Sequence, residues 1–183
     1  MFKQGANRKF FSAPVKLPDQ ICFIINRPLK PATVNKLTHL DARGEINMVD
    51  VSAKPVVHRQ AVACGEIRLQ KATLKLIQSE AIAKGNVLAT ARLAGIMAAK
   101  KTSDLIPLCH PLQITHCEVQ FEIPKSRDRI HILASAKIGG QTGVEMEALA
   151  AVTVAALTIY DMCKAVDKRM RITNIHLVSK EKT

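Results

Sequence analysis

The sequence predicts an α+β domain of the ferredoxin-like βαββαβ class, an antiparallel sheet with helices packed on one face. Three features predict it: an alternating strand pair in the middle of the chain, helical patterns on both sides of that pair, and further strand patterns before and after the helices. The patterns follow the order β-α-α-β-β-α-β, and we treat the first two helices as one layer.

The first strand and the first two helices are predicted from consecutive patterns. Residues 62–69 form the strand, and helical patterns follow over residues 72–83 and 86–101, with Lys84-Gly85 between them. The second helix has small residues along one stripe, which suits close approach of another backbone.

Two paired strands with one wet face are predicted next. Apolar residues alternate with Glu118, Gln120 and Glu122 over residues 117–123, and the alternation resumes over 130–138 after the connection PKSRD. A period of two with one polar face is typical of antiparallel strands that bury only one side.

The long helix is predicted over residues 149–166, where apolar residues recur at steps of three and four. Ala150, Val154 and Leu157 form a second apolar face on the opposite side. Such a helix must be covered on both sides. We expect a sheet on one side and, in a chain this short, a partner subunit on the other. Residues 171–180 are predicted to be the final strand.

Length and composition indicate one folded domain with an appendage. The chain has 183 residues, 48% of them hydrophobic and 23% charged. We place the appendage at residues 1–36 and the catalytic domain at 37–183. Five cysteines without a CxxC pair predict reduced thiols in an intracellular protein and no metal site. The longest uncharged run, residues 148–160, is shorter than the roughly 20 residues of a membrane helix.

The appendage, residues 1–36, is basic. Seven basic side chains and one acid give it +6, half of the net charge of +12, and it contains four of the eight prolines. Phenylalanines among these basic residues resemble a mitochondrial transit peptide. The segment therefore predicts delivery to the mitochondrial matrix. The alternative is a basic tail on a cytoplasmic protein.

The segment DLIPLCHPL, residues 104–112, predicts a stiff loop that presents a thiol and an imidazole. Cys109 and His110 lie between Pro107 and Pro111, which restrict the backbone on both sides. Adjacent Cys and His rarely point at each other, so an acid, base or phosphate donor role suits His110 better than activation of Cys109. A hydrogen-bonded loop histidine is the structural alternative.

Two further sequences combine charge with a helix start. In QTGVEME, residues 141–147, Glu145 and Glu147 flank Met146; carboxylates in a first helical turn are also explained by the helix dipole. Lys84 precedes the second helix, whose first amide groups can hold an anion together with a lysine. A solvated lysine is the simpler reading.

Asp161 and Lys164 are neighbours on the long helix, three residues apart. An ordinary surface ion pair of about 0.2–0.5 kcal/mol explains this equally well. If residues 147–161 are helical, Glu147 and Asp161 lie about 21 Å apart along the axis. A site that uses both must therefore be shared between protomers.

Three blocks between about residues 36 and 180 closely resemble the cyclic pyranopterin monophosphate synthases of molybdenum cofactor synthesis, the MoaC-like family. They are KLTHLDARGEINMVDVSAKP, NVLATARLAGIMAAKKTSDLIPLCHPL and TGVEMEALAAVTVAALTIYDMCKAVDK. The resemblance implies a ferredoxin-like lyase that converts 3',8-cyclo-7,8-dihydro-GTP into cyclic pyranopterin monophosphate and pyrophosphate. It also implies a hexamer built from dimers, with sites at subunit interfaces.

The resemblance also implies roles for individual residues. Asp161, Lys164 and Lys84 are the catalytic residues it implies. No cofactor is required by the sequence, and Mg²⁺ bound to the substrate phosphates is left open. The N-terminal extension and the end at SKEKT, where many relatives continue into a Gly-rich tail, depart from the pattern. Substrate contact falls on Leu108, Cys109, His110, Met146 and Glu147, with Glu145, Lys54 and Arg59 as weaker candidates.

Two other classes of protein compete with an enzyme. The charge of +12 favours a nucleic-acid or nucleotide-binding module, but an aromatic content of 3% without Trp argues against base stacking. The two-faced apolar helix favours a scaffold, which predicts that Asp161→Ala and Lys84→Ala are tolerated. We expect neither a nucleic-acid partner nor a membrane.

Overall fold

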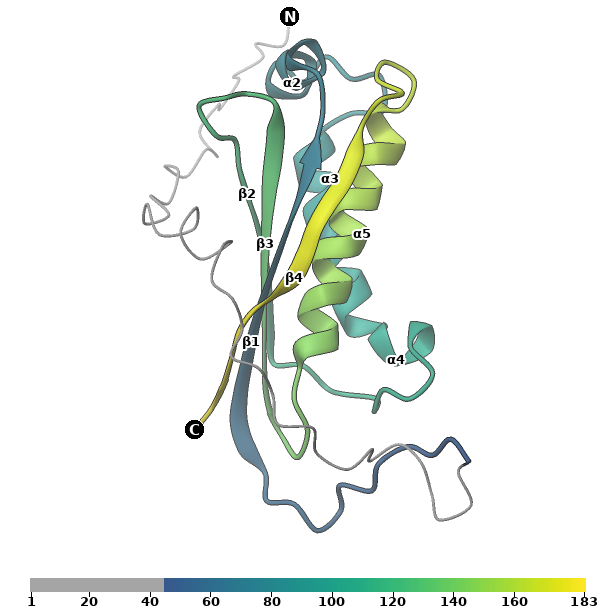
Figure 1. The fold of residues 1–183 in the computed structure, drawn as a ribbon, viewed down its shortest axis with the longest axis vertical. Coiled ribbons are helices and arrows are strands. Elements are labelled where there is room, and N and C mark those ends of the chain that lie inside the picture. Colours follow the sequence, from purple (N-terminus) through teal and green to yellow (C-terminus); the bar gives the residue numbers. More distant parts are fainter. Residues whose placement is uncertain (1–44) are drawn as a thin grey trace, which may run out of the picture. The chain divides into compact units, whose positions relative to one another are not determined.

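The computed structural model describes residues 45–183. The predicted boundary at residue 36 and the basic appendage lie outside these residues. The elements, labelled in Figure 1, are β1 (Val57–Arg68), α2 (Lys71–Gln78), α3 (Val87–Lys100), α4 (Thr102–Leu105), β2 (His116–Glu122), β3 (Arg129–Gly140), α5 (Glu145–Cys163) and β4 (Arg171–Lys182).

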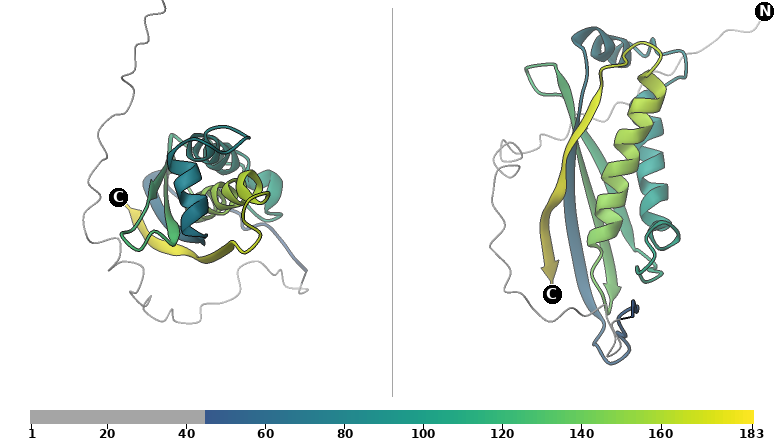
Figure 2. Two further views of the ribbon diagram at one scale, coloured as in Figure 1. Left: turned by 90° about the horizontal axis from the view of Figure 1, so that it is seen from above. Right: turned by 45° about the vertical axis from the view of Figure 1, so that its right-hand side comes forward.

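The four strands form one antiparallel sheet in the order β2-β3-β1-β4. α3 and α5 pack on the same face of this sheet, as Figure 2 shows. The central strands pair over their whole length, from Val57 opposite Gly140 to Arg68 opposite Arg129. The observed order and layers confirm the ferredoxin-like class predicted from the sequence.

α5 is the central helix of the core. Ala148, Ala151 and Val152 are fully buried, and the helix contacts β1 and α3. A Cβ atom placed on Gly95 of α3 would lie 2.8 Å from the carbonyl oxygen of Ala151. The small residues of α3 therefore allow the close helix approach that the sequence predicts, and the two helices share one layer.

The length of α5 raises the question of a membrane. Within the part of the chain that the structure describes, α5 alone is long and apolar enough to cross one, by length and composition, and half of that stretch is buried inside the fold. Packing against the sheet explains its apolar character. Leu157 on the second face is 52% exposed, so this fold leaves that face without a complete cover.

Several element boundaries differ from the sequence prediction, and the largest shift at a strand is that of β1, which starts at Val57 rather than at residue 62 because its first residues pair with the end of β3. α2 ends at Gln78 rather than at residue 83, and Glu80 adopts a left-handed φ of 55°, which a helix cannot continue. α5 runs from Glu145 to Cys163. Val166, predicted to belong to its apolar stripe, lies beyond the helix and is 52% exposed. The short α4 was not predicted.

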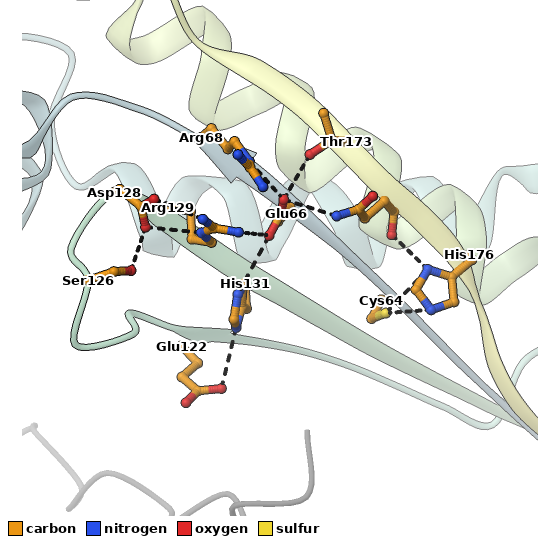
Figure 3. Close-up of polar contacts among 11 residues, drawn as sticks. Cys64, Glu66, Arg68, Glu122, Ser126, Asp128, Arg129, His131, Thr173 and His176 are labelled. Atoms are coloured by element: carbon orange, nitrogen blue, oxygen red, sulfur yellow. Dashed lines mark hydrogen bonds and ion pairs between the residues drawn. The ribbon is translucent and has the colours of Figure 1, made fainter. Parts of the chain in front are cut away.

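The sheet face opposite the helices is polar, as the alternation in β2 and β3 predicts. Figure 3 shows its most connected part, centred on Glu66 of β1. The Glu66 carboxylate accepts hydrogen bonds from Arg68 and Thr173 on one oxygen and from Arg129 on the other, each at 3.0 Å. Because strands on both sides of β1 supply these donors, the network joins three strands.

Candidate active site at the two ends of the long helix

A cluster of two lysines and one aspartate lies at the carboxyl-terminal end of α5. The Lys84 Nζ atom is 2.7 Å from Asp161 Oδ2 and 2.9 Å from the Asp161 carbonyl oxygen. The Lys164 Nζ atom is 2.7 Å from Asp161 Oδ1. Asp161 therefore bridges two ammonium groups that come from different parts of the chain.

Local structure explains how these three side chains meet. Lys164 is the cap residue of α5, and its amide donates to the Tyr160 carbonyl oxygen at 2.9 Å. Lys84 lies in the turn before α3, where Gly85 adopts a φ of 95° that favours glycine. The side chain of Asn86 caps α3 by accepting from the Ala89 amide at 2.9 Å. The turn and cap aim Lys84 at α5.

The charge of this cluster favours anion binding. Hydrogen bonds from Lys164 and then Lys84 lower the pKa of Asp161 to about 2, and the bond to Asp161 raises the pKa of Lys164. All three side chains are about half exposed, between 48% and 57%. Exposed ion pairs contribute little to stability. A net positive cluster that is open to solvent has the charge and the access that an anionic ligand requires.

A cavity of about 500 Å³ lies at the other end of α5. Its wall combines the proline-flanked loop, the start of α5 and the segment before β1. The residues that line it are Val49, Val51, Lys54, Ile106, Leu108, Cys109, His110, Leu112, Thr142, Gly143, Glu145, Met146 and Glu147. It therefore brings together all five substrate-binding residues predicted from the sequence. The lining residues that were not predicted individually, although they lie in the quoted sequence blocks, are Val49, Val51, Ile106, Leu112, Thr142 and Gly143; each is uncharged.

His110 has a defined orientation in this cavity. Its Nε2 atom lies 2.8 Å from the Val49 carbonyl oxygen, and because a carbonyl only accepts, Nε2 carries the proton. The Cys109 amide donates to the Ile106 carbonyl oxygen at 3.0 Å and shapes the same loop. Burial, and then the nearby Glu147, raise the pKa of Cys109. Its sulfur is therefore a poor nucleophile and is suited to contact.

The two glutamates at the start of α5 have different environments. Glu147 is 3% exposed, and burial, with a smaller contribution from Glu145, raises its pKa. Glu145 instead pairs with Lys180 of β4, with Nζ and Oε1 3.3 Å apart. A buried carboxyl with a raised pKa is suited to proton transfer, so Glu147 is the stronger of the two candidates.

The two weaker basic candidates, Lys54 and Arg59, have different positions in the structure. Lys54 lines the cavity. Arg59 directs its guanidinium toward backbone instead: Nε donates to the Gly140 carbonyl oxygen and Nη2 to that of Gln141, both at 3.0 Å. Arg59 therefore holds the connection between β3 and α5, a role that its position in the sequence did not indicate.

The structure does not bring the two groups of residues together within one chain. Glu147 lies near the beginning of α5 and Asp161 near its end, as the predicted separation along the helix requires. Figure 1 shows α5 running lengthwise along the sheet, so its two ends are well separated. Across residues 45–183, no group of three or more His, Cys, Asp or Glu side chains is placed to hold a metal ion.

The fold and these side chains together indicate a general class of protein. An α+β domain with an anion-binding pair of lysines on one aspartate, and a buried carboxyl beside an oriented histidine, is suited to acid and base chemistry on an anionic substrate. The profile of the MoaC family matches residues 48–183, and the chain belongs to this family. The match confirms the resemblance seen in the three sequence blocks.

Close relatives carry the name cyclic pyranopterin monophosphate synthase. The one from Parvibaculum lavamentivorans is 58% identical over 145 residues, 79% of this chain and 91% of the relative. Those from Clostridium perfringens and Chloroflexus aurantiacus are 56% and 57% identical over 146 residues, 80% of this chain and 92% and 90% of the relatives. These organisms are bacteria, which is consistent with the cytoplasmic alternative and does not support the mitochondrial matrix.

Proposed function

We propose that this protein is a cyclic pyranopterin monophosphate synthase, a lyase that converts 3',8-cyclo-7,8-dihydro-GTP into cyclic pyranopterin monophosphate and releases pyrophosphate. The observation that carries the proposal is the exposed cluster of Lys84, Asp161 and Lys164, which combines two cations with a carboxylate of low pKa. Family membership and the names of the relatives support the same reaction.

The chemistry of the reaction suits these groups. A triphosphate requires cations where its charge is bound and where pyrophosphate leaves. The rearrangement requires protons to move on and off ring nitrogen and sugar oxygen. We assign phosphate binding and proton transfer to Lys84 and Lys164, with Asp161 orienting both ammonium groups. Glu147 and His110 then serve the ring system in the cavity, and no resident cofactor takes part.

The complete site is proposed to form between two copies of the chain. One chain holds its two functional groups at opposite ends of α5, too far apart for one small ligand. A twofold axis across α5 would bring Glu147 of one copy toward Asp161 of a second copy, and two equivalent sites would result. The second apolar face of α5, including the exposed Leu157, supports such a contact. A hexamer built from three of these dimers is the assembly we propose.

Incubation of the purified protein with 3',8-cyclo-7,8-dihydro-GTP tests the reaction. The expected result is cyclic pyranopterin monophosphate and pyrophosphate in equal amounts. Parallel reactions with EDTA and with added Mg²⁺ test the metal requirement, and full activity in EDTA is expected from a site that relies on lysines. An intact, folded protein that leaves the substrate unchanged would contradict the proposal.

Complementation between inactive variants tests the shared site. Glu147→Ala and Asp161→Ala are each expected to be inactive alone. After mixing and subunit exchange, half of the sites in a mixed dimer combine the intact Glu147 of one copy with the intact Asp161 of the other. Activity is therefore expected to return. A pair of soluble, assembled variants that stays inactive after demonstrated exchange would place the complete site within one chain.

A further inference from the structure

We propose that Gln141 is a positioning residue that holds the turn carrying Lys54 over the cavity at the start of α5. This inference rests on the proposed function, because it assigns the Lys54 ammonium group to binding of the anionic substrate. Gln141 itself does not line the cavity, so it acts on the substrate only through the turn.

The Gln141 side chain joins two segments that are far apart in the sequence. Its Nε2 atom donates to the carbonyl oxygens of Ser52 and Lys54, at 3.1 Å in each case. A side-chain amide nitrogen has two N–H groups, and two acceptors on one turn use both of them. The connection between β3 and α5 is thereby tied to the segment before β1; both lie at the lower end of the sheet in Figure 1.

The bonds within the turn give it a shape but do not attach it to the domain. The Asp50 carboxylate accepts from the Ser52 amide at 2.8 Å, and the Val51 carbonyl oxygen accepts from the Lys54 amide at 2.9 Å. Attachment comes from side chains of the domain. His110 bonds to the Val49 carbonyl oxygen at the beginning of the turn, and Gln141 bonds at its end.

Gln141 is itself held by the sheet. Arg59 of β1 donates to the carbonyl oxygens of Gly140 and Gln141, both at 3.0 Å. β1 is a central strand, paired on both sides, and is therefore a rigid base for these contacts. The order of support runs from Arg59 to Gln141 and from Gln141 to the turn of Lys54.

Loss of the Gln141 bonds should let the turn open and Lys54 sample many positions. A lysine that contacts the anionic substrate equally before and during reaction affects KM more than kcat. We therefore expect Gln141→Leu to raise KM about tenfold, equivalent to about 1.4 kcal/mol, with kcat unchanged. Gln141→Lys should restore KM, because an ammonium group also donates to both carbonyl oxygens. Gln120→Leu, on β2 and remote from the cavity, is the matched control and should leave KM unchanged.

A double-mutant cycle separates this role from a general structural one. In a Lys54→Ala background, Gln141→Leu should cause no further increase in KM, because the group it positions is gone. Independent, multiplying increases from the two substitutions would overturn the proposal. So would a Gln141→Leu variant with the KM of the wild type.

Hydrogen exchange of residues 49–54 measures the attachment without any turnover. Exchange should be faster in Gln141→Leu than in the wild type and should return to the wild-type rate in Gln141→Lys. Equal exchange in wild type and Gln141→Leu would overturn the attachment. A wild type that does not convert the substrate, with exchange behaving as expected, would instead refute the proposed function while the attachment of the turn stands.

Discussion

Glu66 binds two arginines and Asp161 binds two lysines, yet the two carboxylates lie in opposite environments. Glu66 is 4% exposed and also accepts from Thr173 and Asn174. The side chain of Asp161 is 56% exposed, and its carboxylate partners are two lysines. The first cluster is a buried part of the sheet and the second is open to solvent.

The pKa of each carboxyl group lies below its ordinary value, but the partners of Glu66 must also overcome the effect of burial. Burial by itself raises the pKa of Glu66, but hydrogen bonds from Arg68 and Arg129 outweigh it and hold the pKa below its ordinary value. A buried charge needs all of its partners, because leaving one charge unpaired in the interior is costly. Asp161 is exposed, so water can replace a lysine as its hydrogen-bond partner. The two lysines are therefore available to a ligand.

The largest expected effect is on activity, at the exposed cluster. Lys164→Ala and Lys84→Ala should each lower kcat/KM about 1,000-fold, within the range found for removal of a general acid or base, because each removes a cation from the phosphates. The thermal midpoint should stay at the wild-type value. Steady-state pyrophosphate release and thermal melts measure the two quantities.

Lys168→Ala is the matched control for that experiment. Lys168 follows α5 in the sequence and is exposed, and the ion-pair partners of Asp161 are Lys84 and Lys164 instead. Its activity should equal that of the wild type. Comparable losses in all three variants would mean that net charge, rather than this cluster, determines the rate.

A smaller effect, on stability, is expected at the buried cluster. Glu66→Ala should lower the free energy of unfolding by about 3 kcal/mol, because Arg129 and the donors from β4 lose their acceptor. Urea unfolding followed by circular dichroism measures this change. Glu181→Ala, an exposed acid on β4, is the control. If Glu66→Ala is as stable as the control, the buried cluster contributes no more to stability than an exposed one, which would contradict the proposed difference between the two clusters.

An intermediate case, Glu147, should show opposite effects on stability and activity. Its pKa is raised by burial above the ordinary 4.5, so the folded state binds more protons than the unfolded state. Stability is lost as pH rises through the folded pKa. Glu147→Gln should therefore be more stable than the wild type at pH 7 and equally stable once the pH is well below the ordinary pKa of 4.5, while its activity falls.

Thermal melts of the wild type and Glu147→Gln across this pH range provide the measurement. Glu145→Gln serves as the control, since Glu145 is paired with Lys180 at the surface rather than desolvated. A stability difference that persists unchanged at low pH would show that packing, and not the charge of Glu147, is responsible.

The smallest expected effect is the contribution of Asp161 to stability. Its pKa is lowered from 3.8 to about 2, so any stabilisation is present above pH 3.8 and is lost as pH falls through about 2. Because the side chain is exposed, Asp161→Asn should have the same thermal midpoint as the wild type at pH 7. A clear loss of thermal stability at pH 7 would make this cluster structural, like that of Glu66.

Most of the fold could be predicted because it depends on local periodicity. The patterns over residues 86–101 and 117–138 correspond closely to α3, β2 and β3, since each buries one side against the core. The end of α2 was missed because it depends on the left-handed conformation of Glu80, for which a single sequence carries no reliable signal.

The candidate site was predicted in parts. Asp161 and Lys164 are neighbours on a helix, so their pairing follows from a spacing of three. Lys84 was a candidate from its position before a helix, but it reaches Asp161 across 77 positions, and only the family resemblance grouped the two residues. The supporting roles of Arg59 and Gln141 at the connection and the turn were not predicted, because a hydrogen bond to a distant carbonyl oxygen has no sequence pattern.

The sequence by itself determined the order of elements, the two-faced helix and the chemical groups at each of its ends, because periodicity and charge are properties of neighbouring residues. Tertiary structure alone decided which charges are buried. It placed Glu66 beneath arginines from two strands and left Asp161 in solvent, and it put Lys54 on a turn held by Gln141. Burial and long-range hydrogen bonds depend on segments that meet only after the chain has folded.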